Sequence, residues 1–230
     1  MSVGYVLIAL HAYTHYFSFA EKGLHVKYGA LLVTSLLCWP LLTWAGAQRE
    51  ETLSSSVQTT MQRSISDRME PRLIFANPAD AEVWLSAMSE RLKKRIPDEF
   101  VRRKLLTAIH YEATRAGLDP QLVMGLIHVE SGFNRYAVSV VGARGLMQVM
   151  PFWQRSIGTA EHNLFDMNTN LRYGCTILRH YLDRENGDYF RALGRYNGSL
   201  GKAEYPNLVH GAWKNGYDWQ SPNNGLVAQK

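Results

Sequence analysis

The chain has 230 residues, of which 46% are hydrophobic and 20% are charged, and its formal net charge is +5. This length allows one ordinary globular domain plus an additional segment, and the composition is that of a folded protein. The positive charge favours anionic partners, but no dense basic run with interleaved aromatic residues occurs, so we expect no nucleic-acid binding. Of the two cysteines, Cys38 lies in an apolar N-terminal segment, so the domain keeps only Cys175. A single cysteine cannot form a zinc site and no HExxH motif occurs, so we expect neither a metal nor another cofactor.

An uncharged apolar run at residues 29–45 follows two lysines and ends in the small residues Ala45-Gly46-Ala47. A positive flank, an apolar core and a small-residue site are typical of a secretory signal, which would be cleaved after Ala47. The run also approaches the minimum length of a membrane span. Residues 1–47 are therefore predicted to be an N-terminal extension with either a signal peptide or a signal anchor.

Polar residues dominate the stretch 48–76, which predicts a linker. Asn77-Pro78 then supplies an N-cap and a first-turn proline, and predicts a helix that ends before Pro97. A second helix is predicted over residues 98–116. Apolar residues at helical spacing predict the buried faces of these two helices: Trp84, Met88 and Leu92 in the first, and Val101, Leu105 and Ile109 in the second.

Asp119-Pro120 predicts the start of a third helix, which ends at Glu130-Ser131 with Gly132 as its C-terminal cap. A glycine-rich loop at 138–145 follows. The remaining elements are a short helical stretch from Leu146, a helix over 166–182 and a last helix capped by Asp188. No convincing alternating strand pattern occurs, so the fold is predicted to be all-α, or α+β at most through a small hairpin in the glycine-rich loop.

Glu130 is the first candidate for chemistry. Its helix is apolar, and it lies at the helix C-terminus, where the macrodipole is negative. Both effects disfavour the carboxylate and raise its pKa, and a carboxyl group that stays protonated near neutral pH can protonate a glycosidic oxygen. Position alone does not single it out, since a glutamate at a helix end is more often a solvated surface residue.

The surrounding motifs are more specific. The run from Glu130 to Pro151 reads ESGFNRYAVSVVGARGLMQVMP, and Tyr196-Asn197-Gly198 follows at some distance. This ordered set resembles the Slt-type, family 1 lytic transglycosylases, which are related in fold to goose-type lysozyme. The resemblance covers roughly residues 118–199. It implies a lysozyme-like, single catalytic domain with an N-terminal helical part at 77–117, a catalytic core at 118–204 and a C-terminal tail at 205–230.

The resemblance also implies roles for individual residues. Glu130 would be the lone acid and then the base, and Tyr196 would hydrogen-bond Glu130 and hold it in place. One departure is Arg195, which stands where the family has a small residue before the tyrosine, and we expect it to point outward. The residues expected to bind the glycan are Ser131, Ser139, Met147, Gln148, Met150, Tyr196 and Asn197.

The implied reaction is cleavage of the β-1,4 bond between N-acetylmuramic acid and N-acetylglucosamine in peptidoglycan, with formation of 1,6-anhydromuramyl ends. No Asp or Glu occurs from Ser131 to Ala160, which is compatible with a mechanism that uses one acid. A lysozyme-like hydrolase is an alternative, and it would need a second carboxylate such as Asp166 or Asp183 near the site.

A third hypothesis is a wall-binding scaffold subunit of an envelope-spanning secretion or conjugation system. The expected partners are therefore peptidoglycan strands and, as a further candidate, such an apparatus. We expect membrane contact only through an uncleaved N-terminal segment. The expected location is the periplasm, free or anchored to the inner membrane.

Overall fold

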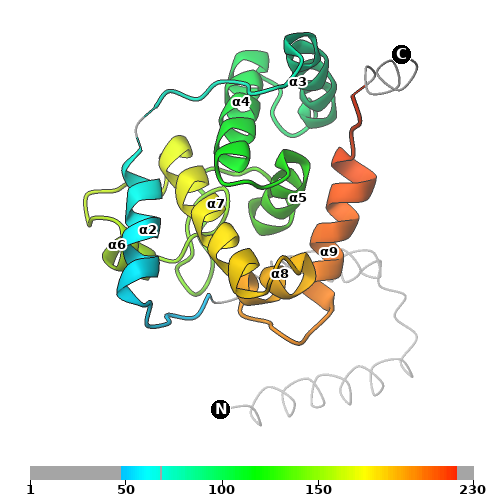
Figure 1. Ribbon diagram of the computed structural model, residues 1–230. Coiled ribbons are helices and arrows are strands. Elements are labelled where there is room, and N and C mark those ends of the chain that lie inside the picture. Colours follow the sequence, from blue (N-terminus) through cyan, green and yellow to red (C-terminus); the bar gives the residue numbers. More distant parts are fainter. Residues whose placement is uncertain (1–47, 68, 222–230) are drawn as a thin grey trace, which may run out of the picture. The chain divides into compact units, whose positions relative to one another are not determined.

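A computed structural model describes residues 48–67 and 69–221, and the predicted signal or anchor at 1–47 lies outside them. Eight α-helices and a π-helical turn lie in this part of the chain (Figure 1): α2 (Ser55–Ser66), α3 (Pro78–Leu92), α4 (Glu99–Arg115), α5 (Pro120–Ser131), α6 (Phe152–Ile157), α7 (Met167–Arg184), α8 (Tyr189–Asn197), α9 (Glu204–Ala212) and the π-helical turn Trp213–Tyr217. None of the helices in this part combines the length and apolarity that a membrane crossing requires.

Polar caps start five of the helices where the sequence predicts them. Asn77 accepts a hydrogen bond from a first-turn backbone N–H of α3, and four aspartates do the same for α4, α5, α7 and α8. Gly132 ends α5 in the left-handed conformation, with φ 58°. Over the described residues, β-pairing is limited to isolated bridges of Arg144 with Val138 and Val149. The prediction of an all-α fold is confirmed.

Helix α2 lies within the stretch that the sequence predicted to be a linker. Ser54 caps its first turn, and the side chains of Met61 and Ile65 are buried, while most other residues of α2 are exposed or half-buried. Val57, Met61 and Ile65 recur every four residues, which is helical spacing, but the polar residues between them led the whole stretch to be interpreted as a linker. Helix α2 packs against α6 and α7, and these contacts bury its apolar side chains.

The short helix expected from Leu146 begins later, at Phe152. Gln148 adopts a φ of 48°, and Val149 pairs with Arg144, so the backbone at these positions cannot be helical.

In α4, Val101 is 48% exposed and does not belong to the predicted buried face, whereas Leu105 and Ile109 are buried.

Helix α7 contacts α2, α4 and α8 and carries a fully buried stripe, Leu171, Cys175, Leu178 and Leu182, as the sequence predicts. Gly174 on the same helix allows a loop to approach closely. A Cβ added at this position would lie 2.3 Å from the Met147 sulfur, so a larger residue would displace that loop.

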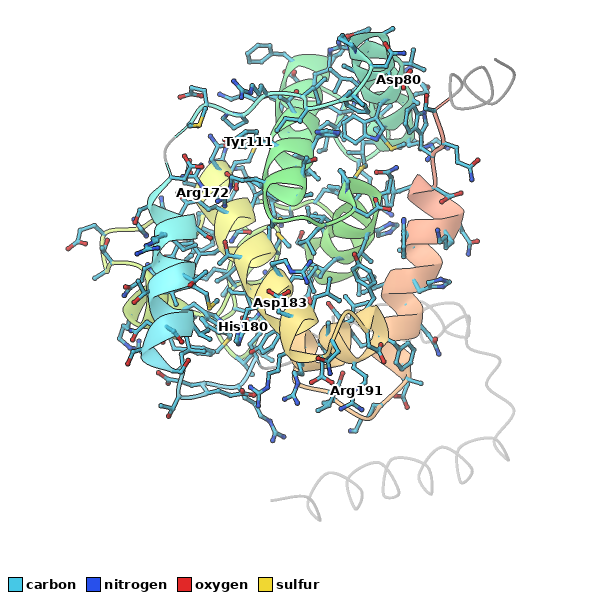
Figure 2. All side chains as sticks on the ribbon, in the orientation of Figure 1. Asp80, Tyr111, Arg172, His180, Asp183 and Arg191 are labelled. Carbon is cyan, nitrogen blue, oxygen red and sulfur yellow. The ribbon has the colours of Figure 1, made fainter. Side chains whose placement is uncertain are left out.

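A buried ion cluster joins α4 to α7. The Glu112 side chain is fully buried, and its two oxygens pair with Arg115 at 2.8 Å and with Arg172 at 2.9 Å. Arg172 extends from α7 toward α4, where Tyr111 lies (Figure 2). Two cations and several hydrogen bonds compensate this carboxylate for the loss of water.

Helix α5 packs against α4, α9 and the π-helical turn. The approach is close at Gly125, where an added Cβ would lie 2.9 Å from the backbone nitrogen of Trp213. This packing brings the chain after residue 203 onto the helix that carries Glu130.

Candidate active site

Glu130 lies in the last turn of α5 and is only 6% exposed. Loss of hydration raises the pKa of its carboxyl from 4.5 to about 8, and a hydrogen bond from Tyr205 acts in the opposite direction. The desolvation expected from the apolar helix is therefore present. At neutral pH most molecules hold a neutral carboxylic acid at this position.

Tyr205, on α9, donates this hydrogen bond from its hydroxyl to Glu130 Oε1 at 2.5 Å. The resemblance implied this contact for Tyr196, and Tyr205 was predicted to be the first residue of a C-terminal tail. In the structure the Tyr196 hydroxyl donates to the backbone oxygen of Met147 at 2.8 Å instead. Tyr205 is 75 residues from Glu130 in the chain, and the packing of α9 on α5 brings the two side chains together. The sequence pattern does not indicate this packing.

Tyr196 nevertheless belongs to the surroundings of Glu130. It is 1% exposed, and burial, followed by the negative charge of Glu130, raises the pKa of its hydroxyl well above the usual value. A hydrogen bond with the Gln48 side chain has the opposite effect. Tyr196 thus fixes the Met147 loop from a position next to the acid. Its neighbour Asn197 is the last residue of α8 and is 5% exposed.

Gln148 braces the loop that follows α5. Its side-chain Nε2 donates to the backbone oxygens of Ala137 at 3.2 Å and Gly145 at 2.9 Å, and the residue is 4% exposed. Asn170 on α7 holds the same loop, accepting from the Met147 N–H at 2.8 Å and donating to the Arg144 backbone oxygen at 2.8 Å. The left-handed backbone at Gln148 turns its side chain inward.

The two serines expected at the site also make loop contacts. Ser131 donates from its hydroxyl to the Leu146 backbone oxygen at 2.7 Å, which ties the end of α5 to the loop. Ser139 accepts from the Ala143 N–H at 3.0 Å and closes the turn between them. Both side chains are half-buried.

Met147 and Met150 lie on opposite sides of the Gln148–Val149 step. Met147 is fully buried against Gly174, whereas Met150 is half-buried at the edge of the core. Its backbone N–H donates to Gln48 Oε1 at 3.3 Å. Gln48, which belongs to the predicted linker, is 4% exposed, and this hydrogen bond connects it to the predicted glycan-binding loop.

Asp166 and Asp183, the candidates for a second carboxylate, are engaged elsewhere. Asp166 caps α7 by accepting from the Thr169 N–H at 2.9 Å, and Asp183 pairs with Arg179 on the exposed side of α7. Within residues 48–67 and 69–221, no three His, Cys, Asp or Glu side chains come together as metal ligands.

Comparison with known proteins supports the motif-based resemblance. Residues 107–208 match the family described as Transglycosylase SLT domain. This stretch begins in α4 and ends in α9, so it includes both Glu130 and Tyr205.

Two relatives show the extent of the similarity. A transglycosylase of Enterobacteria phage PRD1 is 42% identical over 88 residues, which are 38% of this chain and 32% of that protein. The membrane-bound lytic murein transglycosylase C of Haemophilus influenzae strain PittEE is 33% identical over 115 residues, or 43% of this chain and 32% of that protein. The chain thus spans about a third of the length of these relatives.

Among solved structures, an inactive mutant of the lytic transglycosylase Slt from Pseudomonas aeruginosa aligns with 72% of this chain and 34% of its own. The TM-score is 0.39, and the sequence identity is 16%.

Proposed function

We propose that this chain is a peptidoglycan lytic transglycosylase with Glu130 as its acid and base, since residues 107–208 match the family described as Transglycosylase SLT domain. The observation that carries the proposal is the buried carboxyl group of Glu130, whose pKa is raised to about 8 and which accepts a hydrogen bond from Tyr205 inside the matched region.

In the first step, the neutral Glu130 carboxyl donates its proton to the glycosidic oxygen between N-acetylmuramic acid and N-acetylglucosamine. A group with a pKa near the working pH is both protonated and able to release its proton. As the bond breaks, positive charge develops on the muramyl sugar, and the sugar's own N-acetyl oxygen stabilises it.

In the second step, the same carboxylate removes the proton from the muramyl C6 hydroxyl, whose oxygen attacks C1. Desolvation makes the Glu130 carboxylate a stronger base than one in water. The Tyr205 hydroxyl donates to this carboxylate and keeps it oriented between the two steps. The product is a 1,6-anhydromuramyl end, and no water is consumed.

The glycan is held by the loop after α5 and by the end of α8. Ser139 and Met150 reach the surface of this region in part, whereas Asn197 is buried and Gln148 and Met147 fix the loop from within. A water-consuming hydrolase is the weaker candidate, because Asp166 and Asp183 are occupied by a helix cap and by an arginine.

The proposed location is the periplasmic side of the envelope, reached through the signal peptide or anchor at 1–47. Membrane-bound transglycosylases among the relatives support this location. We also propose an envelope-spanning secretion or conjugation apparatus as a partner, since such an apparatus needs a local opening in the wall.

The test is digestion of purified sacculi by the full chain, followed by mass spectrometry of the released muropeptides. The expected products are one water lighter than hydrolytic products and end in anhydromuramic acid. The Glu130→Gln variant should release none of them. Products of normal mass with reducing ends would replace the transglycosylase by a hydrolase.

A further inference from the structure

The side chain of Gln48 occupies a polar pocket built by the predicted glycan-binding loop and α6. Its Oε1 accepts hydrogen bonds from the Met150 N–H at 3.3 Å and from the Trp153 indole N–H at 2.9 Å. Its Nε2 donates to the backbone oxygen of Gln148 at 3.4 Å. The pocket therefore presents two donors to a carbonyl oxygen and one acceptor to the neighbouring N–H.

A carboxamide and an acetamido group present the same pair of atoms to such a pocket. Each has a carbonyl oxygen that accepts and, on the same carbon, a nitrogen that donates. The repeating sugars of peptidoglycan each carry an acetamido group. The pocket lies next to Tyr196, whose hydroxyl forms a hydrogen bond with the Gln48 side chain. The negative charge of Glu130 raises the pKa of the same hydroxyl.

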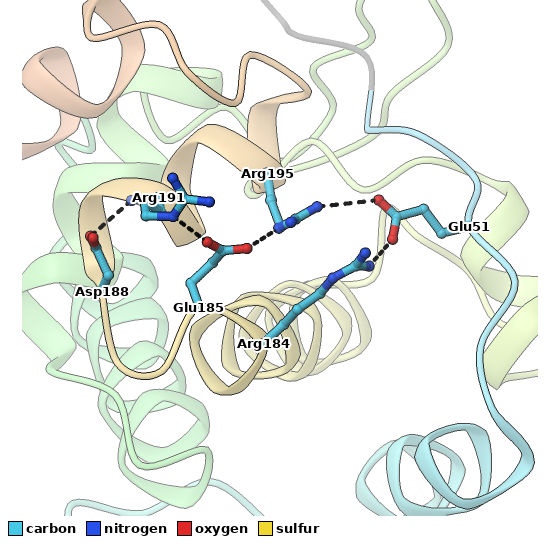
Figure 3. Close-up of polar contacts among 6 residues, drawn as sticks. All are labelled: Glu51, Arg184, Glu185, Asp188, Arg191 and Arg195. Atoms are coloured by element: carbon cyan, nitrogen blue, oxygen red, sulfur yellow. Dashed lines mark hydrogen bonds and ion pairs between the residues drawn. The ribbon is translucent and has the colours of Figure 1, made fainter.

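Ion pairs hold the residues that follow Gln48 against α7 and α8. Glu51 pairs with Arg184 at the end of α7 and with Arg195 of α8, the latter at 3.8 Å (Figure 3). Arg195 also pairs with Glu185, which binds Arg191 in turn. The arginine that replaces the small residue of the family motif thus connects the chain before α2 to the helix that carries Tyr196.

The segment covers part of this region and leaves part of it open. Leu53 packs against the core, while a cavity remains beside Glu51, lined also by Arg49, Arg195, Gly198 and Leu200. A glycan chain that filled the Gln48 pocket would have to displace the segment.

We propose that Gln48–Leu53 form a strap across one end of the proposed glycan-binding region, which comprises the loop after α5 and the end of α8, and that the Gln48 carboxamide takes the place of an acetamido group of the substrate. This proposal rests on the proposed function, because it assigns that region to a peptidoglycan strand. The strap lowers the affinity for glycan by the fraction of molecules in which it is closed, and substrate binding opens it.

The test measures binding of the uncharged N-acetylglucosamine tetramer to the full chain by calorimetry. Loss of the strap's three hydrogen bonds in Gln48→Ala should lower the Kd about tenfold. Glu51→Gln leaves Gln48 unchanged but removes both ion pairs of Glu51, which favour the closed strap. This variant should also have a lower Kd than the parent.

Gln58→Ala is the matched control. Gln58 also anchors the N-terminal part of the described chain, donating from Nε2 to the Ser156 backbone oxygen at 2.8 Å, but it lies outside the pocket. Its loss should leave the Kd unchanged. If Gln48→Ala binds the tetramer as well as the parent or more weakly, or if none of the variants binds it, the strap proposal is wrong.

Hydrogen exchange gives a second readout that needs no cleavage. Amides of residues 49–53 should exchange faster when the tetramer is bound, and slower exchange would contradict displacement of the strap. Sacculus digestion by the same variants separates the two proposals. Tighter binding and faster exchange without any anhydro products would refute the lytic activity and leave the strap standing.

Discussion

The most informative perturbation is Glu130→Gln, because it keeps the shape of the side chain and removes its ionisation. The folded protein raises the pKa of Glu130 from 4.5 to about 8, so between these values the folded state binds more protons than the unfolded state. Stability is therefore highest at low pH and falls as the pH rises through this window. In the glutamine variant this contribution to the pH dependence disappears.

The size of the effect follows from the two pKa values. Each unit of difference is worth about 1.4 kcal/mol, so the parent should lose about 4 kcal/mol relative to Glu130→Gln between pH 5 and pH 8.5. Above pH 8.5 the difference should change little, since both states are then mostly ionised. Glutamine can still accept the hydrogen bond from Tyr205, which limits secondary changes.

The assay is urea unfolding at a series of pH values, followed by tryptophan fluorescence. Comparing variant with parent at each pH cancels groups that titrate alike in both proteins. Glu90→Gln serves as the control, since its side chain is 74% exposed and lies on the surface of α3. A difference between Glu130→Gln and the parent that is constant with pH would refute the buried, neutral carboxyl and with it the proposed acid.

Three further variants test the surroundings of the acid and the packing beneath it. Tyr205→Phe removes the hydrogen-bond donor that stabilises the Glu130 carboxylate, so the pKa of Glu130 should rise and kcat should fall about tenfold. The alkaline limb of the pH–activity profile should move to higher pH. An unchanged alkaline limb would show that Tyr205 does not affect the ionisation of Glu130. Gly174→Ala forces a methyl group against Met147 and should cost roughly 1–3 kcal/mol in urea unfolding and slow cleavage, whereas parent-like values would show that the loop yields. Glu112→Gln leaves two partly buried arginines without their buried carboxylate and should cost roughly 3–5 kcal/mol by the same measurement, and a loss below about 1 kcal/mol would contradict a buried ion cluster.

Much of the fold could be predicted because its signals are local. The caps of α3, α5 and α7 stand directly before apolar residues at helical spacing, and these helices begin where the sequence predicts. Helices α2 and α9 were not predicted. In α2 the cap Ser54 and the spacing of Val57, Met61 and Ile65 are a local signal, but it stands in a polar stretch and was missed. Helix α9 has no side-chain cap and buries few residues, so its formation depends on neighbouring helices that local pattern does not describe.

The residues of the candidate site likewise differ in whether local sequence or tertiary packing determines their contacts. Glu130 was identified from a motif that lies next to it in the chain, and its burial follows from the apolar helix. The contact from Tyr205 depends on how α9 packs on α5, and no periodicity encodes that packing. The inward turn of Gln148 depends on a left-handed backbone angle, which the sequence of a non-glycine residue does not indicate.

The buried thiol of Cys175 has a consequence for the redox behaviour of the domain. Burial and the nearby Glu112 raise the pKa of this thiol far above its usual value, and the residue is fully buried in α7. Because the thiolate is the form that attacks disulfides and oxidants, Cys175 stays reduced in an oxidising compartment as long as the helices are packed. The rate at which a thiol reagent modifies Cys175 therefore measures how often the helices around α7 separate.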